Sequence, residues 1–151
     1  MQKRQGGFLV SKIHQLAGRI FTKKLKDYDL YDLNSAQGRI IFVLWQNDEI
    51  SIQELSKRTS LEKSTLSRML ERLENSGYIQ RIASADDRRK TLVKLTPKNE
   101  ELKDAYEEVS NDMLDLFYKG FTEDEIDEFE SYLKKIHENL FQFEKNSKKG
   151  E

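Results

Sequence analysis

The stretch 51–81, "SIQELSKRTSLEKSTLSRMLERLENSGYIQR", constrains the fold more than any other part of the chain. Ser51 and Glu54 have the spacing of a capping box, which predicts a short helix that ends near Thr59. After a three-residue turn, an apolar stripe at helical spacing predicts a second helix, which ends at the stop signal 75–77. The stripe consists of Leu66, Met69, Leu70 and Leu73. The sequence therefore predicts two helices that meet at a tight turn.

A β-hairpin is predicted directly after the second helix. "YIQRIA" and "TLVKLT" each alternate apolar and polar residues with a period of two, and the charged segment between them supplies the turn. Helix, turn, helix and hairpin in this order make a winged helix-turn-helix, whose second helix normally lies in the major groove of DNA. The hairpin is then the wing.

Helices are also predicted on both sides of this block. Residues 8–28 carry apolar side chains three and four positions apart, and Asn34 with Gln37 caps a short helix that is apolar almost all round. Thr96 and Pro97 have the pattern of an N-cap and first helical residue for a long helix that reaches Gly120. A further capping box at residues 122 and 125 starts a last helix that continues to residue 143. The predicted fold class is mostly α with a small antiparallel β-hairpin (α+β).

The formal net charge of −1 hides a strong segregation of charge along the chain. Residues 1–26 contain seven basic and no acidic side chains, whereas residues 27–55 contain one basic and six acidic ones. Residues 56–94 contain ten basic against five acidic side chains, and residues 100–131 contain two against thirteen. Local fields decide what a surface attracts, so the basic central block favours a phosphate-bearing partner.

The outward face of the second helix is suited to reading a DNA groove. If the leucines face the core, Ser64, Thr65, Arg68 and Arg72 face away from it, with Ser67 on the flank. Short hydroxyl side chains allow close approach to base edges, and arginine can bond O6 and N7 of guanine together. The alternative is an ordinary solvated helix face, which the two glutamates at positions 71 and 74 would also suit.

The charged turn of the wing has a physical explanation. Asp87 can accept hydrogen bonds from the backbone or side chain of Arg89 and hold that side chain extended, which saves rotamer entropy of about 2 kcal/mol on binding. Arg88 and Lys90 are predicted to face the flanking phosphates, and Arg89 the minor groove, whose narrow A·T form has an enhanced negative potential. The alternative is a charged and well-solvated hairpin loop.

These residues resemble the multiple-antibiotic-resistance regulator (MarR) family of transcription factors. "LNSAQGRIIFVL", "IQELSKRTSLEKSTLSRMLERLENSGYIQR" and "DDRRKTLVKLTPK" together carry the resemblance, in register and without a gap over residues 33–98. The pair Asp87 and Arg89 before "LVKLT" is its most specific element. The resemblance implies a homodimeric repressor or activator that binds double-stranded DNA, with the wing arginine in the minor groove and a helix that starts near Lys63 in the major groove.

The chain departs from the family pattern at two positions. Glu62 stands where the family often has Ser or Asp as the helix N-cap, and Asn99 stands where glycine is common after "LTPK". Glutamate is a poorer N-cap than serine, although its charge complements the helix dipole. Neither departure touches the proposed DNA contacts, but the first leaves the pose of the recognition helix open.

A small-molecule effector is implied by the resemblance alone, because many family members bind phenolic or other small amphipathic ligands between the dimerisation region and the DNA-binding lobe. The candidate lining residues are Tyr28, Tyr31, Phe42 and Trp45. The alternative is that aromatic residues at helical spacing belong to the core.

The terminal helices carry more apolar surface than one small core needs, which predicts pairing of two chains over a palindromic site. We therefore expect a winged helix-turn-helix DNA-binding lobe at residues 33–98 and a helical dimerisation region formed by residues 1–32 and 99–151. The alternative is that both helices pack only within one chain.

Catalysis and metal binding find no support in the sequence. There is no cysteine, the two histidines lack metal-site spacing, and no nucleophile has a catalytic motif around it. The longest apolar run, 40–45, is too short to span a bilayer. We expect a cytoplasmic protein with no cofactor. The rival functions are a winged-helix protein-docking module that does not bind DNA and an enzyme or ligand carrier.

Overall fold

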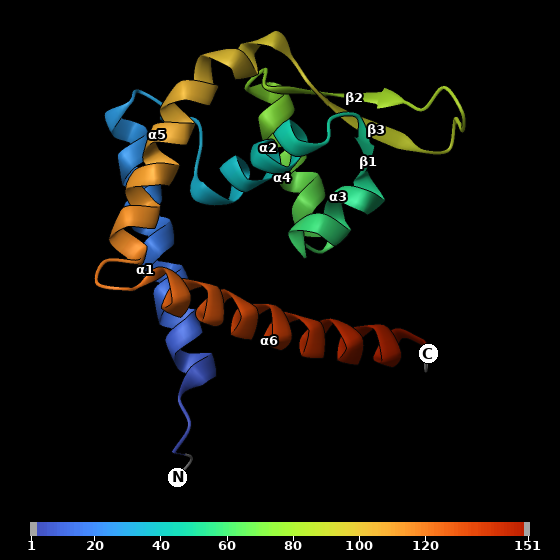
Figure 1. Cartoon of the computed structure of the whole chain (residues 1–151). Helices are drawn as coiled ribbons and strands as arrows, with labels where there is room; N and C mark the ends of the chain where they lie inside the picture. The colour runs from blue at the N-terminus through green and yellow to red at the C-terminus, as the bar shows by residue number, and fades with distance from the viewer. Residues whose placement is uncertain (1–2, 150–151) are drawn as a thin grey trace. The chain divides into compact units, whose positions relative to one another are not determined.

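The computed structural model describes residues 3–149. These fall into two compact units, and the boundary between the units lies in the chain between Met113 and Leu114. The first unit contains α1 (Gly6–Asp27), α2 (Ser35–Gln46), β1 (Ile50–Ser51), α3 (Ile52–Thr59), α4 (Lys63–Asn75), β2 (Ile79–Ala83), β3 (Thr91–Leu95) and a 3₁₀ turn (Pro97–Asn99). Helix α5 (Glu100–Phe117) begins in the first unit and ends in the second, which also contains α6 (Glu123–Lys149) (Figure 1). The predicted fold class, mostly helical with a small antiparallel sheet, is confirmed.

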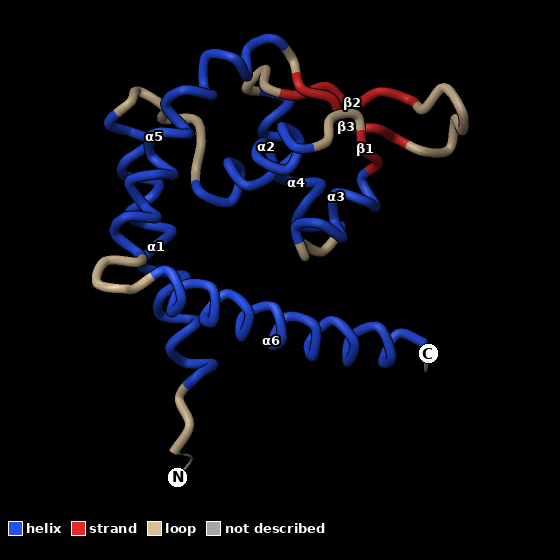
Figure 2. Tube along the Cα trace, viewed as in Figure 1, coloured by secondary structure: helices blue, strands red, loops and turns tan. Residues whose placement is uncertain are grey.

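The sheet has three strands in the order β1, β3, β2, and all neighbours are antiparallel. Strands β2 and β3 form the predicted hairpin, in which Arg81 lies opposite Val93. Figure 2 shows the hairpin loop extending beyond the helices that pack around the sheet. Strand β1 was not predicted, because its two residues, Ile50 and Ser51, are too few to show an alternating pattern. It pairs Ile50 with Val93 and so joins the end of α2 to the wing.

One apolar core holds the helices of the first unit against this sheet. Its most deeply buried members come from nearly every element, and each is fully or almost fully inaccessible: Leu25, Ile40, Ile41, Leu44, Leu55, Leu66, Leu70, Leu73, Ile79, Val93, Leu102 and Val109. Helix α2 contributes three of them, in agreement with its predicted place in a core. Burial of each such side chain stabilises the fold by about 1.5–3 kcal/mol, so α4 is strongly fixed in its rotation about its own axis.

The predicted capping boxes form at two of three places. At Asn34 and Gln37 each side chain accepts the other's backbone N–H, at 2.9 and 3.0 Å, and Thr122 and Glu125 make the same reciprocal pair. Ser51 Oγ accepts the N–H of Glu54 at 3.0 Å, but Glu54 Oε1 accepts from Arg58 Nε instead of returning to Ser51. That third box is therefore only half formed, because an ion pair one turn away competes for the carboxylate.

Thr96 and Pro97 take the predicted positions of N-cap and first helical residue, but the first turn is a 3₁₀ turn (Pro97–Asn99) and the α-helix begins at Glu100. Thr96 Oγ1 makes no cap bond and instead donates to the carbonyl of Gly77 at 2.5 Å. This hydrogen bond joins the end of β3 to the segment that follows α4.

The second unit is a helical hairpin whose turn is enclosed by aromatic rings. Phe117, Tyr118, Phe121 and Phe129 make ring contacts with centroids 5.0–6.4 Å apart. The Tyr118 hydroxyl donates to Glu130 at 2.7 Å, and Gly120 takes the positive φ of 86° that the reversal requires. None of the described residues of α6 is fully buried.

Tyr106 of α5 packs edge-on between two other aromatic rings, with centroids 5.4 Å from Phe21 and 5.2 Å from Trp45. Burial raises the pKa of Tyr106 to about 12. The ring also lies on the backbone of α2 at Gly38, where an added Cβ would be only 2.6 Å from Tyr106 Cε2. Glycine at position 38 is therefore required for the close approach of α5 to α2.

We expect Gly38→Ala to destabilise the protein by about 1–3 kcal/mol, because the new methyl group overlaps a ring that two neighbours hold in place. Urea denaturation followed by circular dichroism measures the change in the free energy of unfolding.

Gly7→Ala is the matched control for this substitution. Gly7 also lies in a helix, but nothing stands within 4 Å of its added Cβ. Alanine there should be neutral or stabilise by up to about 1 kcal/mol. Equal destabilisation by the two substitutions would show that the Tyr106 contact does not limit position 38.

Candidate nucleic-acid interface

Helix α4 buries one face and exposes the other, as its apolar stripe requires. Leu66, Leu70 and Leu73 are fully buried. The predicted contact residues on the opposite side are exposed in five cases, Lys63, Ser64, Ser67, Arg68 and Arg72, whereas Thr65 is half-buried on the flank. We predicted Thr65 on the outward face and Ser67 on the flank, whereas in the structure Ser67 is exposed and Thr65 lies on the flank. The exposed face carries three cations and two hydroxyl groups.

The turn before α4 is held by side-chain hydrogen bonds from α3. Ser56 Oγ donates to the carbonyl of Leu61, Thr59 Oγ1 accepts the backbone N–H of Leu61 at 3.3 Å, and Ser60 takes a left-handed conformation with φ of 57°. Glu62 makes no side-chain cap. The first-turn amides of α4 therefore lack the acceptor that a Ser or Asp cap would supply, in agreement with the departure seen in the sequence.

The wing turn orients Arg89 through Asp87. Asp87 Oδ1 accepts from the backbone N–H of Arg89 at 3.0 Å and from its Nε at 3.3 Å, while the Arg89 side chain stays 91% exposed. Ser84 Oγ accepts from the N–H groups of Asp86 and Asp87, and the backbone of residue 90 closes the turn. An exposed ion pair contributes only about 0–1 kcal/mol to folding, so its main effect is to limit the conformations of the guanidinium.

The other two cations of the wing, Arg88 and Lys90, are exposed on either side of Arg89. Neither makes an ion pair within the described range 3–149. Their side chains are therefore available to a phosphate, as the sequence analysis expects.

A contact that the sequence did not reveal connects α4 to the wing. Glu74 Oε2 accepts the backbone N–H of Arg81 at 2.9 Å, and Glu74 Oε1 accepts from Arg81 Nη2 at 3.0 Å. One carboxylate at the end of the recognition helix thus holds both the backbone and the side chain of strand β2. The only indication in the sequence is a pair of opposite charges seven positions apart. This spacing predicts no contact by itself, because the two side chains come together only where Gly77, with φ of 87°, reverses the chain.

The four aromatic residues predicted to line a ligand cleft differ in their burial. Trp45 is half-buried, donates from Nε1 to Asn99 Oδ1 at 2.8 Å, and lines a hollow of about 620 Å³ beside β3. Tyr28, Tyr31 and Phe42 are 38%, 69% and 47% exposed and do not line that hollow. Asn99 is therefore a buried structural partner of Trp45 at the position where the family pattern often has glycine.

Comparison with known proteins agrees with this geometry. The MarR family profile matches residues 33–91. The multiple antibiotic resistance protein MarR of Salmonella typhimurium is 30% identical over 131 residues, which are 86% of this chain and 89% of that protein. The chain belongs to the MarR family.

Other relatives extend the similarity over most of the chain. The transcriptional regulator SarZ of Staphylococcus haemolyticus is 28% identical over 123 residues, 79% of this chain and 82% of that protein. The crystal structure of a mutant MarR from E. coli, complexed with operator DNA, aligns with a TM-score of 0.76 at 29% identity and covers 86% of this chain and 91% of that one. The chain is thus a DNA-binding transcriptional regulator of the MarR family and not an enzyme.

Within residues 3–149 no group of His, Cys, Asp and Glu is arranged to hold a metal ion. No helix in the same range combines the length and the apolar character needed to cross a membrane.

The Glu74–Arg81 pair predicts a pH dependence of stability. The hydrogen bonds from Arg81 lower the pKa of Glu74 below its ordinary value of 4.5. The carboxylate therefore stabilises the folded state above pH 4.5, and this contribution is lost as the pH falls through the lowered pKa. Glu74→Gln should cost no more than about 1 kcal/mol at neutral pH, because both side chains are about one-third exposed.

The measurement is urea denaturation of wild type and Glu74→Gln at about pH 7 and about pH 3.5, where the difference in stability should shrink. Glu71→Gln is the control, since Glu71 is exposed on the same helix and has no ion pair in the range 3–149. A difference that stays constant between the two pH values would contradict the assigned role of Glu74.

Proposed function

We propose that this protein is a homodimeric repressor that binds a palindromic operator and is released by a small amphipathic ligand. Each chain places α4 in the major groove and its wing in the adjacent minor groove. The observation that carries this proposal is that α4 and the wing both expose cations, while the Glu74–Arg81 contact connects them. The proposed DNA contacts are Lys63, Ser64, Thr65, Ser67, Arg68, Arg72, Arg88, Arg89 and Lys90.

Base reading is assigned to Arg68 and minor-groove reading to Arg89. Arg68 lies opposite the buried Leu66 and Leu70, where a guanidinium can bond guanine in the major groove. Arg89 is exposed yet held by Asp87, so that less rotamer entropy is lost when it enters the groove. The remaining cations balance phosphate charge, which makes the affinity dependent on salt.

Dimerisation is supported by apolar surface that each unit leaves uncovered. In the first unit, Phe8 and Leu16 of α1 are 63% and 52% exposed. In the second unit, Leu140 and Phe143 of α6 are 66% and 75% exposed. Stripes of large apolar side chains on long helices indicate a protein–protein interface, and a second copy of the chain is the partner that a palindromic site requires.

Repression and ligand release complete the proposed function. One relative, from Pseudomonas putida, is named as a transcriptional repressor and is 27% identical over 109 residues. The ligand site is assigned to Tyr28, Tyr31, Phe42 and Trp45, of which three are well exposed. The alternative of a winged-helix docking module without DNA binding is disfavoured, because the chain belongs to a family of DNA-binding regulators.

We expect Arg89→Ala to weaken binding to a selected operator duplex by about 1–3 kcal/mol. An arginine in the minor groove also displaces counterions from it, so the salt dependence of the affinity should become shallower. Fluorescence anisotropy with a duplex recovered from a random library, titrated at several salt concentrations, measures both quantities. Arg68→Ala in the same titration should instead relax the preference at one base pair in each half-site.

Lys119→Ala is the control for the loss of one positive charge, since Lys119 is exposed in the turn between α5 and α6, outside the proposed contacts. It should leave the affinity nearly unchanged. If Arg89→Ala binds as tightly as wild type, the wing has no part in recognition.

Leu140→Asp should convert the protein from dimer to monomer at micromolar concentration, because it places a charge in the uncovered stripe of α6. Analytical ultracentrifugation measures the mass of the wild type and the variant. Asn139→Asp adds the same charge at the neighbouring exposed position and should remain dimeric. A monomeric wild type would refute the assignment of these helices to a dimer interface.

A further inference from the structure

The carbonyl end of α4 is held by one lysine from the segment that leads into α5. Lys98 Nζ donates to the carbonyl of Ser76, the C-cap residue of α4, at 2.6 Å. Cations are favoured at the C-terminus of a helix, because the last carbonyls lack partners within the helix and form the negative end of its dipole. Lys98 therefore caps α4 from a place 22 positions further along the chain.

Two more groups hold the ammonium group of Lys98. It lies 4.5 Å from the centroid of the Tyr78 ring and 3.9 Å from Asp32 Oδ2. The Tyr78 hydroxyl donates to the other oxygen of the same carboxylate, Asp32 Oδ1, at 3.1 Å. Burial, together with the charge of Asp32, raises the pKa of the Tyr78 hydroxyl above its ordinary value of 10, so it stays a donor at neutral pH. One cation thus joins the end of α4, the start of the wing and the connection between α1 and α2.

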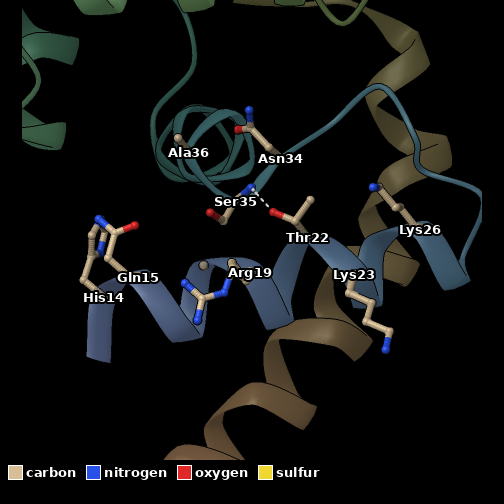
Figure 3. A pocket seen from close by; sticks show the side chains of 10 residues that line it. His14, Gln15, Arg19, Thr22, Lys23, Lys26, Asn34, Ser35 and Ala36 are labelled. Carbon is tan, nitrogen blue, oxygen red and sulfur yellow. Dashed lines mark hydrogen bonds between the residues drawn. The ribbon is translucent and has the colours of Figure 1, made fainter. Parts of the chain in front are cut away.

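The connection that carries Asp32 is fixed at both of its ends. At its start, the backbone N–H of Leu30 donates to the carbonyl of Leu25 at 3.0 Å. At its end, Ser35 donates its backbone N–H to Thr22 Oγ1 at 3.2 Å, which ties the first turn of α2 to α1 (Figure 3). The backbone of Asp32 is therefore held between two helices that are themselves joined to each other.

The segment that carries Lys98 is fastened to the turn after α4 as well. Thr96 Oγ1 donates to the carbonyl of Gly77 at 2.5 Å, and the backbone N–H of Thr96 donates to the carbonyl of Tyr78 at 2.9 Å. The stem of Lys98 packs on the backbone of Gly77, where an added Cβ would lie 3.5 Å from Lys98 Cδ. A shift of α4 along its own axis would therefore break the Lys98 contact with Ser76.

We propose that Lys98 is a positioning residue for DNA recognition, which holds the end of α4 in the pose that reads the bases. The inference rests on the proposed place of α4 in the major groove. At its other end α4 has no side-chain cap, because Glu62 makes none, so the contacts at the carbonyl end carry more of its alignment. Lys98 acts through Ser76 and touches no base itself.

The test is fluorescence anisotropy of the full-length protein with the selected operator duplex and with its single-base-pair variants, at several salt concentrations. Lys98→Met keeps the stem of the side chain and removes the cation. We expect operator binding to weaken about fivefold, the upper end of what a cation contributes at an exposed helix C-terminus. The penalties for changed base pairs should shrink, because the helix is less firmly aligned. The salt dependence should stay that of wild type, because no phosphate contact is lost.

Two variants serve as controls. Lys103→Met removes the same charge from an exposed position on α5 that makes no ion pair in the range 3–149, and it should bind as wild type does. Lys98→Arg should keep the affinity, since a guanidinium can also donate to a carbonyl and lie over an aromatic ring. Urea denaturation checks that each variant is fully folded under the conditions of the titration.

Wild-type affinity in Lys98→Met overturns the proposal, and so does equal weakening by Lys103→Met. A shallower salt dependence with unchanged base-pair penalties also overturns it, since Lys98, whose side chain is 42% exposed, would then bind a phosphate directly. Arg68→Ala in the same titration reports on the place of α4. If Arg68→Ala leaves every base preference unchanged, that placement fails and this inference with it. If Arg68→Ala relaxes a preference and Lys98→Met has no effect, only the role of Lys98 fails.

Discussion

The burial of one face of α4 determines most of what this protein can do. Leu66, Leu70 and Leu73 have no accessible surface, and together they anchor the helix to the core with several kcal/mol of hydrophobic free energy. A rotation of about 100° would expose one of these leucines and bury an arginine without a partner, which costs more than the helix can recover elsewhere. The outward position of Arg68 and Arg72 is therefore a consequence of core packing.

Carboxylates in the DNA-binding lobe act as positioning groups for the cations near them. Asp87 holds the Arg89 backbone and guanidinium at the tip of the wing, and Glu74 holds Arg81 at its base. Each contact is too exposed to contribute much to folding. The Asp87 contact removes conformations that a free Arg89 would have to give up on binding, and the Glu74 contact holds strand β2 against the end of α4. These positioning roles give a physical reason for the acidic residues on the surface proposed to contact DNA.

The features that the sequence predicted are those that depend on local spacing. The leucine stripe of α4, the Asn34–Gln37 box, the hairpin and the Asp87–Arg89 contact all join residues close together in the chain, so that helix and strand periodicity or turn chemistry is enough to find them. The Trp45–Asn99 hydrogen bond joins residues 54 positions apart, and the Glu74–Arg81 contact joins a helix to a strand across the turn at Gly77. Such features depend on how the elements pack, which no local pattern reports.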